Sequence, residues 1–371
     1  MIDNASSKSF EDLIKEVHEP GLCGECGGCV SFCTAGEIKA IEMSESGPPK
    51  YVNKDNCLKC GICYFVCPQT HVLNDQLNAK FKYKAPIGNQ IKVASCHATS
   101  EEIRKQATDG GAITAILSYL LENKLIDGAI VCKRKGPFNR VPFFATTKED
   151  LIEAAGSHYD LSSQVVGLEK YNTFIATNIT LKKVMSPDLL NIAIVGTPCQ
   201  INSIRKMQEL SILPAHIVKY TLGLFCYLNF SFSDEDRKML EEKFKFSFED
   251  VDSMNIRDDL ILYLKNNEVL HISFSDLHEI GRPACFACPD FSNIYADISF
   301  GGLGSEEKLT TAIIRTKIGE ELYKNAINKG YIKEPKELNK PNKKDEILAK
   351  VKEFSKKKIE RAETTLKGKR P

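Results

Sequence analysis

The sequence contains no tryptophan, and its 371 residues include no apolar run that approaches a membrane span, which needs about 20 consecutive apolar residues. Neither basic nor acidic residues are in excess, since the sequence has 50 of the former and 49 of the latter. No global positive field therefore points to nucleic acid as a partner. The N-terminus lacks the pattern of a secretory signal. We expect a cytoplasmic globular protein of about two domains, and its oligomeric state stays open.

Cysteine is plentiful by comparison. The fourteen cysteines are too sparse for a disulfide scaffold and fit a reducing compartment. Eight of them form two runs, in which the spacing C-x2-C-x2-C-x3-C occurs twice: Cys23, Cys26, Cys29 and Cys33, then Cys57, Cys60, Cys63 and Cys67. This spacing is typical of bacterial two-cluster ferredoxins, in which the fourth cysteine of each run binds the other cluster.

The two runs therefore predict two 4Fe-4S clusters. One would be held by Cys23, Cys26, Cys29 and Cys67, and the other by Cys57, Cys60, Cys63 and Cys33. Structural zinc would use paired cysteines and would not need the third and fourth of each run. Disulfides are disfavoured without a secretion signal. Two neighbouring clusters would relay electrons one at a time.

The sequence pattern divides the chain into three segments. Residues 1–80 predict an α+β, bacterial-type two-cluster ferredoxin domain. Residues 81–332 alternate helical and strand patterns, which predicts an α/β domain. Its expected strands are 128–132, 191–195, 216–226, 297–300 and 311–315, with a hairpin over 261–264 and 269–274. Residues 333–371, with fourteen basic and seven acidic residues, predict a helical tail that is either solvated or a surface for a partner or membrane.

Four further cysteines suggest a third cluster. Cys285 and Cys288 form a C-x-x-C pair, while Cys199 and Cys226 each follow an expected strand. Loops that follow neighbouring strands of an α/β sheet converge at one edge, where such folds place ligands. A redox pair, half of a zinc site and buried structural thiols remain alternatives. The last two, Cys96 and Cys132, are interpreted as core or surface thiols.

Six segments carry more specific motifs: residues 109–115, 156–159, 196–200, 223–226, 282–291 and 296–305. Together they resemble the coenzyme F420 hydrogenase/dehydrogenase beta-subunit family. That resemblance implies one FAD, one 4Fe-4S cluster among these segments, and hydride exchange with F420, a deazaflavin carrier of methanogens. With the N-terminal ferredoxin included, the chain is most similar to the iron-sulfur subunit of F420H2 dehydrogenase, then to the beta subunit of F420-dependent formate dehydrogenase.

The resemblance also implies the cofactor-binding residues: Gly110, Gly111, Thr114, Ser157, His158, Tyr159, Thr197, Arg282, Gly301, Gly302, Gly304 and Ser305. Backbone N–H groups at a helix start suit a flavin pyrophosphate, although a tight helix start needs the same glycines. His158 is the candidate catalytic proton donor, at a position where the family often has lysine. Arg282 would pair with a phosphate or the deazaflavin's glutamate tail, or with a surface carboxylate.

These features predict an iron-sulfur flavoprotein with three 4Fe-4S clusters and FAD. It would oxidise F420H2 or reduce F420 and exchange single electrons with another redox protein or complex subunit, in the cytoplasm or peripherally on a membrane complex. The alternatives are the beta subunit of an F420-dependent formate dehydrogenase or hydrogenase, and a non-catalytic ferredoxin-type electron-transfer subunit. NAD is disfavoured, since no strand–GxGxxG–helix element is present.

Overall fold

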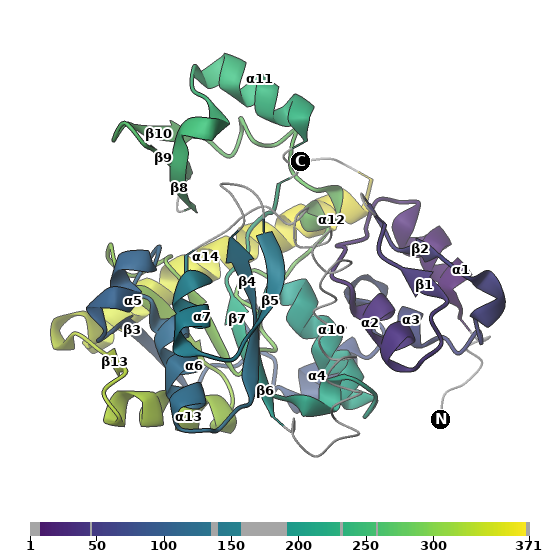
Figure 1. The fold of residues 1–371 in the computed structure, drawn as a ribbon, viewed down its shortest axis with the longest axis horizontal. Helices are drawn as coiled ribbons and strands as arrows, with labels where there is room; N and C mark the ends of the chain where they lie inside the picture. The colour runs from purple at the N-terminus through teal and green to yellow at the C-terminus, as the bar shows by residue number, and fades with distance from the viewer. Residues whose placement is uncertain are drawn as a thin grey trace.

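The computed structural model describes residues 8–44, 47–134, 140–156, 191–230, 233–256 and 259–368 (Figure 1). Its α-helices are α1 (Phe10–Leu13), α2 (Gly28–Ala35), α3 (Ile62–Phe65), α4 (Asn74–Lys80), α5 (Glu101–Gln106), α6 (Ala112–Glu122), α7 (Lys148–Glu153), α10 (Pro198–Glu209), α11 (Asp234–Phe244), α12 (Pro283–Phe286), α13 (Lys317–Asn328) and α14 (Pro341–Leu366). Its strands are β1 (Ile41–Glu42), β2 (Lys50–Tyr51), β3 (Lys92–Ala98), β4 (Gly128–Arg134), β5 (Arg140–Ala145), β6 (Ile192–Gly196), β7 (Val218–Leu224), β8 (Val251–Ile256), β9 (Leu260–Leu264), β10 (Val269–Ile272), β11 (Ile298–Gly301), β12 (Thr310–Ile314) and β13 (Ile332–Lys333).

An eight-stranded sheet forms the centre of the molecule, in the order β13-β3-β12-β11-β7-β6-β4-β5. The four middle strands β11, β7, β6 and β4 are parallel. The strands on both sides of them are antiparallel. The predicted strands of this domain are thus confirmed, but the sheet is mixed. The carboxyl ends of the parallel strands meet at one edge, which is where a ligand site is expected.

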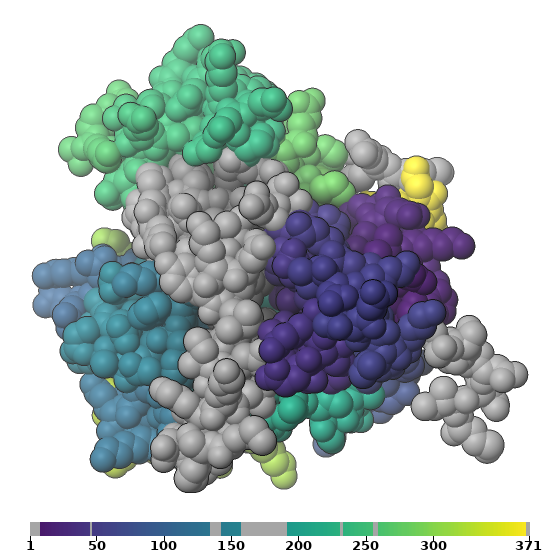
Figure 2. All heavy atoms as spheres, turned by 45° about the vertical axis from the view of Figure 1, so that its right-hand side comes forward, coloured from purple at the N-terminus to yellow at the C-terminus, as the bar shows by residue number. Residues whose placement is uncertain are grey.

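Helices cover both faces of the sheet. Alternate residues of β6 point to opposite faces, so that Ala193 joins the core under α6 and α13 while Ile194 joins the core under α10. The second core also includes Val66 and Leu77 from the first 80 residues. The N-terminal unit (residues 8–80) is therefore packed onto α10 and the sheet rather than tethered by a linker, as Figures 1 and 2 show.

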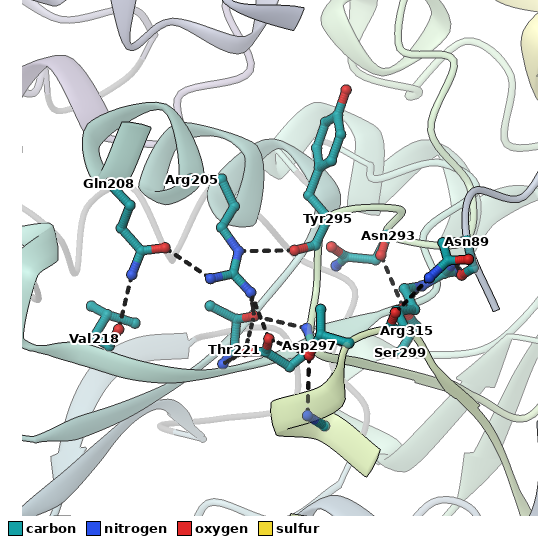
Figure 3. A network of polar contacts seen from close by, with 12 residues as sticks. Asn89, Arg205, Gln208, Val218, Thr221, Asn293, Tyr295, Asp297, Ser299 and Arg315 are labelled. Atoms are coloured by element: carbon teal, nitrogen blue, oxygen red, sulfur yellow. Dashed lines mark hydrogen bonds and ion pairs between the residues drawn. The ribbon is translucent and has the colours of Figure 1, made fainter. Parts of the chain in front are cut away.

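A buried polar network fixes α10 on the sheet (Figure 3). The Arg205 guanidinium lies 2.9 Å from the Asp297 carboxylate, and both side chains are almost fully buried. Arg205 also donates to Tyr295 O, and Asp297 accepts from the backbone and hydroxyl of Thr221 on β7. Since α10 begins at Pro198, this network also sets the position of Cys199.

Beside the sheet, β8, β9, β10 and α11 form a smaller lobe with its own apolar core (top of Figure 1). The predicted hairpin is confirmed, because β9 and β10 pair in antiparallel register with Val269 opposite Tyr263. The lobe is connected back to the sheet domain through residues 273–282 and α12.

The C-terminal segment forms the 26-residue helix α14, which is packed against the sheet domain. Its buried stripe is Ile347, Val351, Ser355, Lys358 and Ala362, spaced at three or four residues so that all lie on one helical face. The expectation of a solvated or partner-binding tail is therefore wrong for this face. The basic residues that suggested it mostly cover the opposite side.

Candidate functional site

The two N-terminal cysteine runs have the same backbone conformation. Gly27 and Gly61 precede α2 and α3 with φ values of 76° and 77°, a left-handed conformation that favours glycine. Glu25 and Lys59, at equivalent positions in the two runs, also have positive φ values. Each loop can therefore direct its first two cysteines toward one centre, together with the third cysteine in the first turn of the helix that follows.

Charge interactions between the thiols, together with the elements that carry them, group the cysteines into three sets, although Cys199 also interacts with Cys26 of another set. The inner set is Cys23, Cys26, Cys29 and Cys67; burial and the other members raise the pKa of Cys26 to about 11 and that of Cys29 well above its ordinary value. The outer set is Cys33, Cys57, Cys60 and Cys63; burial and the other members raise the pKa of Cys63 to about 12. The fourth cysteine of each run thus lies with the first three of the other run.

The sheet set is Cys199, Cys226, Cys285 and Cys288. Burial, followed by the charges of Cys285, Cys288 and Cys199, raises the pKa of Cys226 to about 12, although Lys358 opposes this rise. The four cysteines of this set come from the start of α10, the end of β7 and the loop around α12. Asn229 donates to Cys226 Sγ at 3.0 Å, and the Thr197 hydroxyl lies 3.3 Å from Cys199 Sγ.

Neighbouring sets are adjacent. Cys199 lines the cavity that the inner set surrounds, and a Cβ placed on Gly24 would lie 3.9 Å from Cys199 Sγ. The charge of Cys63 in the outer set contributes to the raised pKa of Cys29 in the inner set. The Arg282–Glu25 ion pair, at 2.6 Å and largely buried, joins the sheet domain to the N-terminal unit between the sheet set and the inner set. The three sets therefore follow one another in the order sheet, inner, outer.

The donor chemistry of each set fits an iron-sulfur cluster. Buried thiols with raised pKa values stay protonated, and bound iron would stabilise the thiolate form. Within the described ranges, no three histidine, cysteine or acidic side chains have the geometry of a single-ion site. A 4Fe-4S cluster makes a different demand, since its four thiolates bind separate irons.

A cavity of about 240 Å³ opens at the carboxyl ends of the parallel strands. Its walls come from the ends of β4, β6, β7 and β11, the start of α6, and Phe354 of α14. Tyr227 and Phe291 add an aromatic wall whose rings pack against each other and against Phe354. Two residues connect the cavity to the sheet set. Cys226 is a member of that set and lines the cavity, and Thr197 lines the cavity and contacts Cys199 of the set.

Of the predicted cofactor residues, those that line the cavity are Gly111, Thr114, Thr197, Gly301 and Gly302. A side chain at Gly302 would clash with the Asp109 carboxylate, at 2.7 Å, so this loop needs glycine to approach the start of α6. Ser157, His158 and Tyr159 lie outside the described residues. Their predicted roles, including that of His158 as proton donor, stay predictions.

Four predicted residues lie elsewhere. Arg282 ion-pairs with Glu25 instead of facing the cavity, so its assignment to a cofactor phosphate is corrected. Gly304 packs on Ile347 of α14, and the Ser305 hydroxyl is 2.7 Å from that of Thr311, so the second half of this loop turns away. Gly110 is buried and donates to the Thr310 hydroxyl, which makes it a packing residue.

The sequence interpretation missed two groups in the cavity wall. Cys132 was interpreted as a core or surface thiol, but it lies in the carboxyl-terminal half of strand β4 and lines the cavity. Its place at the end of an expected strand was the available signal. Phe354 comes from the tail helix, and no local pattern pointed to it.

Comparison with known proteins identifies the family. The family model for the N-terminal part of the coenzyme F420 hydrogenase/dehydrogenase beta subunit matches residues 93–169, and the model for its C-terminal part matches residues 189–340. The beta subunit of coenzyme F420 hydrogenase from Methanosarcina barkeri is 31% identical over 286 residues, which is 76% of this chain and 92% of that protein. The chain belongs to the coenzyme F420 hydrogenase/dehydrogenase beta-subunit family.

Other relatives agree with this assignment. A subunit of the F(420)H(2) dehydrogenase of Methanosarcina mazei is 26% identical over 324 residues, or 84% of each chain. A chain in the solved F420-reducing NiFe hydrogenase complex from Methanosarcina barkeri has a TM-score of 0.66 at 30% identity, covering 77% of this chain and 94% of that one. The predicted resemblance is confirmed, and the chain is an oxidoreductase subunit. The ferredoxin assignment of residues 1–80 stays a prediction, because both family models begin at residue 93 or later.

None of the helices in the described part of the chain combines the length and apolar composition needed to cross a membrane.

Proposed function

We propose that this chain exchanges hydride with coenzyme F420 and passes electrons singly to or from a redox partner subunit. The observation that carries the proposal is the shared wall of the cavity and the sheet set, since Cys226 belongs to both. A relay needs a site for a two-electron carrier directly beside the first one-electron centre. Family membership supports the same assignment.

The cavity would hold FAD. Gly111 begins α6 at the cavity, where the free N–H groups of the helix start favour an anionic pyrophosphate. The aromatic wall of Tyr227, Phe291 and Phe354 gives flat apolar surface for a ring system. When bound, FAD supplies the chemistry that the side chains lack, because it exchanges hydride with F420 and single electrons with iron-sulfur clusters.

The three thiol sets would each hold one 4Fe-4S cluster. The cysteines of the sheet and inner sets are half-buried, whereas the outer set includes the exposed Cys60. Leu58 beside it is 72% exposed. We propose that the partner subunit docks at this outer end, and that the identity of the partner distinguishes a dehydrogenase, a formate dehydrogenase and a hydrogenase. Electron flow in either direction uses the same order of sets.

The test is anaerobic purification of the full chain followed by counting of iron, sulfide and flavin. We expect about twelve irons, or four for each cluster, with one FAD, and F420H2-dependent reduction of a viologen dye. About eight irons without flavin would instead identify a non-catalytic ferredoxin-type subunit.

A cysteine variant tests the sheet set directly. Cys285→Ser should lower the iron content by about four atoms and leave the inner and outer sets intact. The control is Cys132→Ser, which changes a thiol of the cavity wall outside the three sets and should keep the full iron content. Equal iron contents in the two variants would show that Cys285 holds no cluster.

A further inference from the structure

The C-terminal helix places a buried lysine beside the sheet set. Lys358 is 1% exposed, and its ammonium group donates to two main-chain carbonyl oxygens, those of Cys226 and, at 2.8 Å, Asp290. Burial of an ammonium group is costly unless nearby groups compensate for the lost water. Its place in the buried stripe of α14 therefore needs a reason other than packing.

The thiols of the sheet set supply that reason. Burial alone would lower the pKa of Lys358, but the thiolates of Cys288, Cys226 and Cys285, the form in which these residues would bind iron, raise it above its ordinary value. One turn later on the same helix, Arg361 donates to Tyr227 O at 2.6 Å and to Cys285 O at 3.3 Å. Two cations of α14 thus bond the main-chain carbonyls of Cys226 and Cys285, two members of the sheet set.

Asp290 is the acidic group nearest to this arrangement. Its carboxylate accepts from the backbone N–H groups of Asn293 and Ile294, and burial raises its pKa. Those hydrogen bonds direct the carboxylate to its own loop, while its carbonyl oxygen faces Lys358. The Lys358 ammonium group therefore lies on the main chain of Cys226 and Asp290, next to the cysteines of the sheet set.

We propose that Lys358, assisted by Arg361, is a positioning residue that raises the reduction potential of the cluster held by the sheet set. Reduction adds one negative charge to that cluster, and a fixed cation in a buried site stabilises the added charge. This inference rests on the proposed function, because it requires a third cluster. It also gives the basic C-terminal helix a role in electron transfer.

The inner set has a comparable lysine, which offers a contrast. Lys206 of α10 is fully buried and donates to Cys67 O at 2.7 Å. Burial lowers its pKa to about 8, while the charges of Cys67 and Cys26 act in the opposite direction. Because Lys206 contacts a member of the inner set and Lys358 a member of the sheet set, we expect them to change the reduction potentials of different clusters.

The test is a redox titration of the full-length protein monitored by electron paramagnetic resonance, with iron and flavin counted in each sample. Lys358→Met should disfavour reduction of one cluster about tenfold, a shift of about 59 mV to lower potential for a one-electron couple. Lys206→Met should shift a different midpoint. The surface control Lys357→Met, which removes an ion pair with Glu353, should shift none.

The outcomes separate the two proposals. Wild-type protein with about eight irons contradicts the proposed function itself. Wild-type protein with three clusters, but with unchanged midpoints in Lys358→Met, overturns the role of Lys358. If Lys358→Met does not retain the third cluster, Arg361→Met decides: a lowered midpoint supports the inference, and an unchanged midpoint overturns it.

Discussion

The Arg205–Asp297 pair should be one of the strongest single contributions to the stability of the sheet domain. The side chains are 10% and 3% exposed, so neither charge is screened by water. Removing one partner of such a buried pair costs about 3–5 kcal/mol, because the other charge stays buried. Replacing Arg205 by methionine keeps much of the volume and removes the cation, which isolates this effect.

The remaining contacts place the expected cost at the lower end of that range. Without Arg205, the Asp297 carboxylate still accepts from Thr221 N and Oγ1 and from Thr316 Oγ1, at 2.8–2.9 Å. We therefore expect a loss of about 3 kcal/mol for Arg205→Met. Asp297→Asn should cost less, because the amide retains one acceptor for Thr221 and leaves Arg205 bonded to Tyr295 O.

The assay is urea unfolding followed by far-ultraviolet circular dichroism, with the double variant included to complete a mutant cycle. A coupling energy of about 1–3 kcal/mol is expected for residues in one network. The more exposed pair Lys243–Asp276, at 2.7 Å, provides the control, and Lys243→Met should cost below about 1 kcal/mol. Similar costs for Arg205→Met and Lys243→Met would refute the reasoning, since burial is the difference between them.

Three further predictions concern the contact between the N-terminal unit and the sheet domain, flavin binding in the cavity, and stability at low pH. Glu25→Gln should leave Arg282 buried without its counter-ion, and faster proteolysis between the N-terminal unit and the sheet domain should reveal the loosened joint. Gly302→Val should place a side chain against Asp109 and lower flavin content with iron unchanged. Burial lowers the pKa of His18 to about 4, so its contribution to stability is present above pH 6.5 and is lost as the pH falls toward 4. The urea midpoint should decline over that interval, and a His18→Gln protein that declines equally would contradict this.

How much the sequence revealed depended on how local each feature is. The two cysteine runs carry the most local signal, since the first three cysteines of each run lie within seven residues; their assignment to clusters stays a prediction. Strand β3 was missed because its inward residues are small, namely Ala94, Cys96 and Ala98, and Ser95 and His97 between them weaken the apolar pattern. A strand that pairs with β12, more than 200 residues away, gives little local signal of burial.

The errors at the site have the same origin. The sequence left Arg282 with three candidate partners, namely a phosphate, the deazaflavin's glutamate tail and a surface carboxylate. Its actual partner, Glu25, could not be named because it is distant in sequence. The face of α14 was hidden for another reason. A stripe that contains Ser355 and Lys358 does not register as apolar, although both side chains are fully buried.

The order of the three thiol sets explains why the chain is folded as one unit. The inner and outer sets draw all their cysteines from one segment of 45 residues, whereas the sheet set needs α10, β7 and the loop around α12 to be in place. In the proposed relay, electron transfer between the sheet and inner sets requires Cys199 to stay beside Gly24. That contact depends on the packing of Val66 and Leu77 against α10 and on the Arg282–Glu25 pair. A flexible linker at this joint would break the proposed relay while leaving every cysteine in its own set. On that proposal, the apolar and ionic contacts of the joint are functional features as much as the cysteines are.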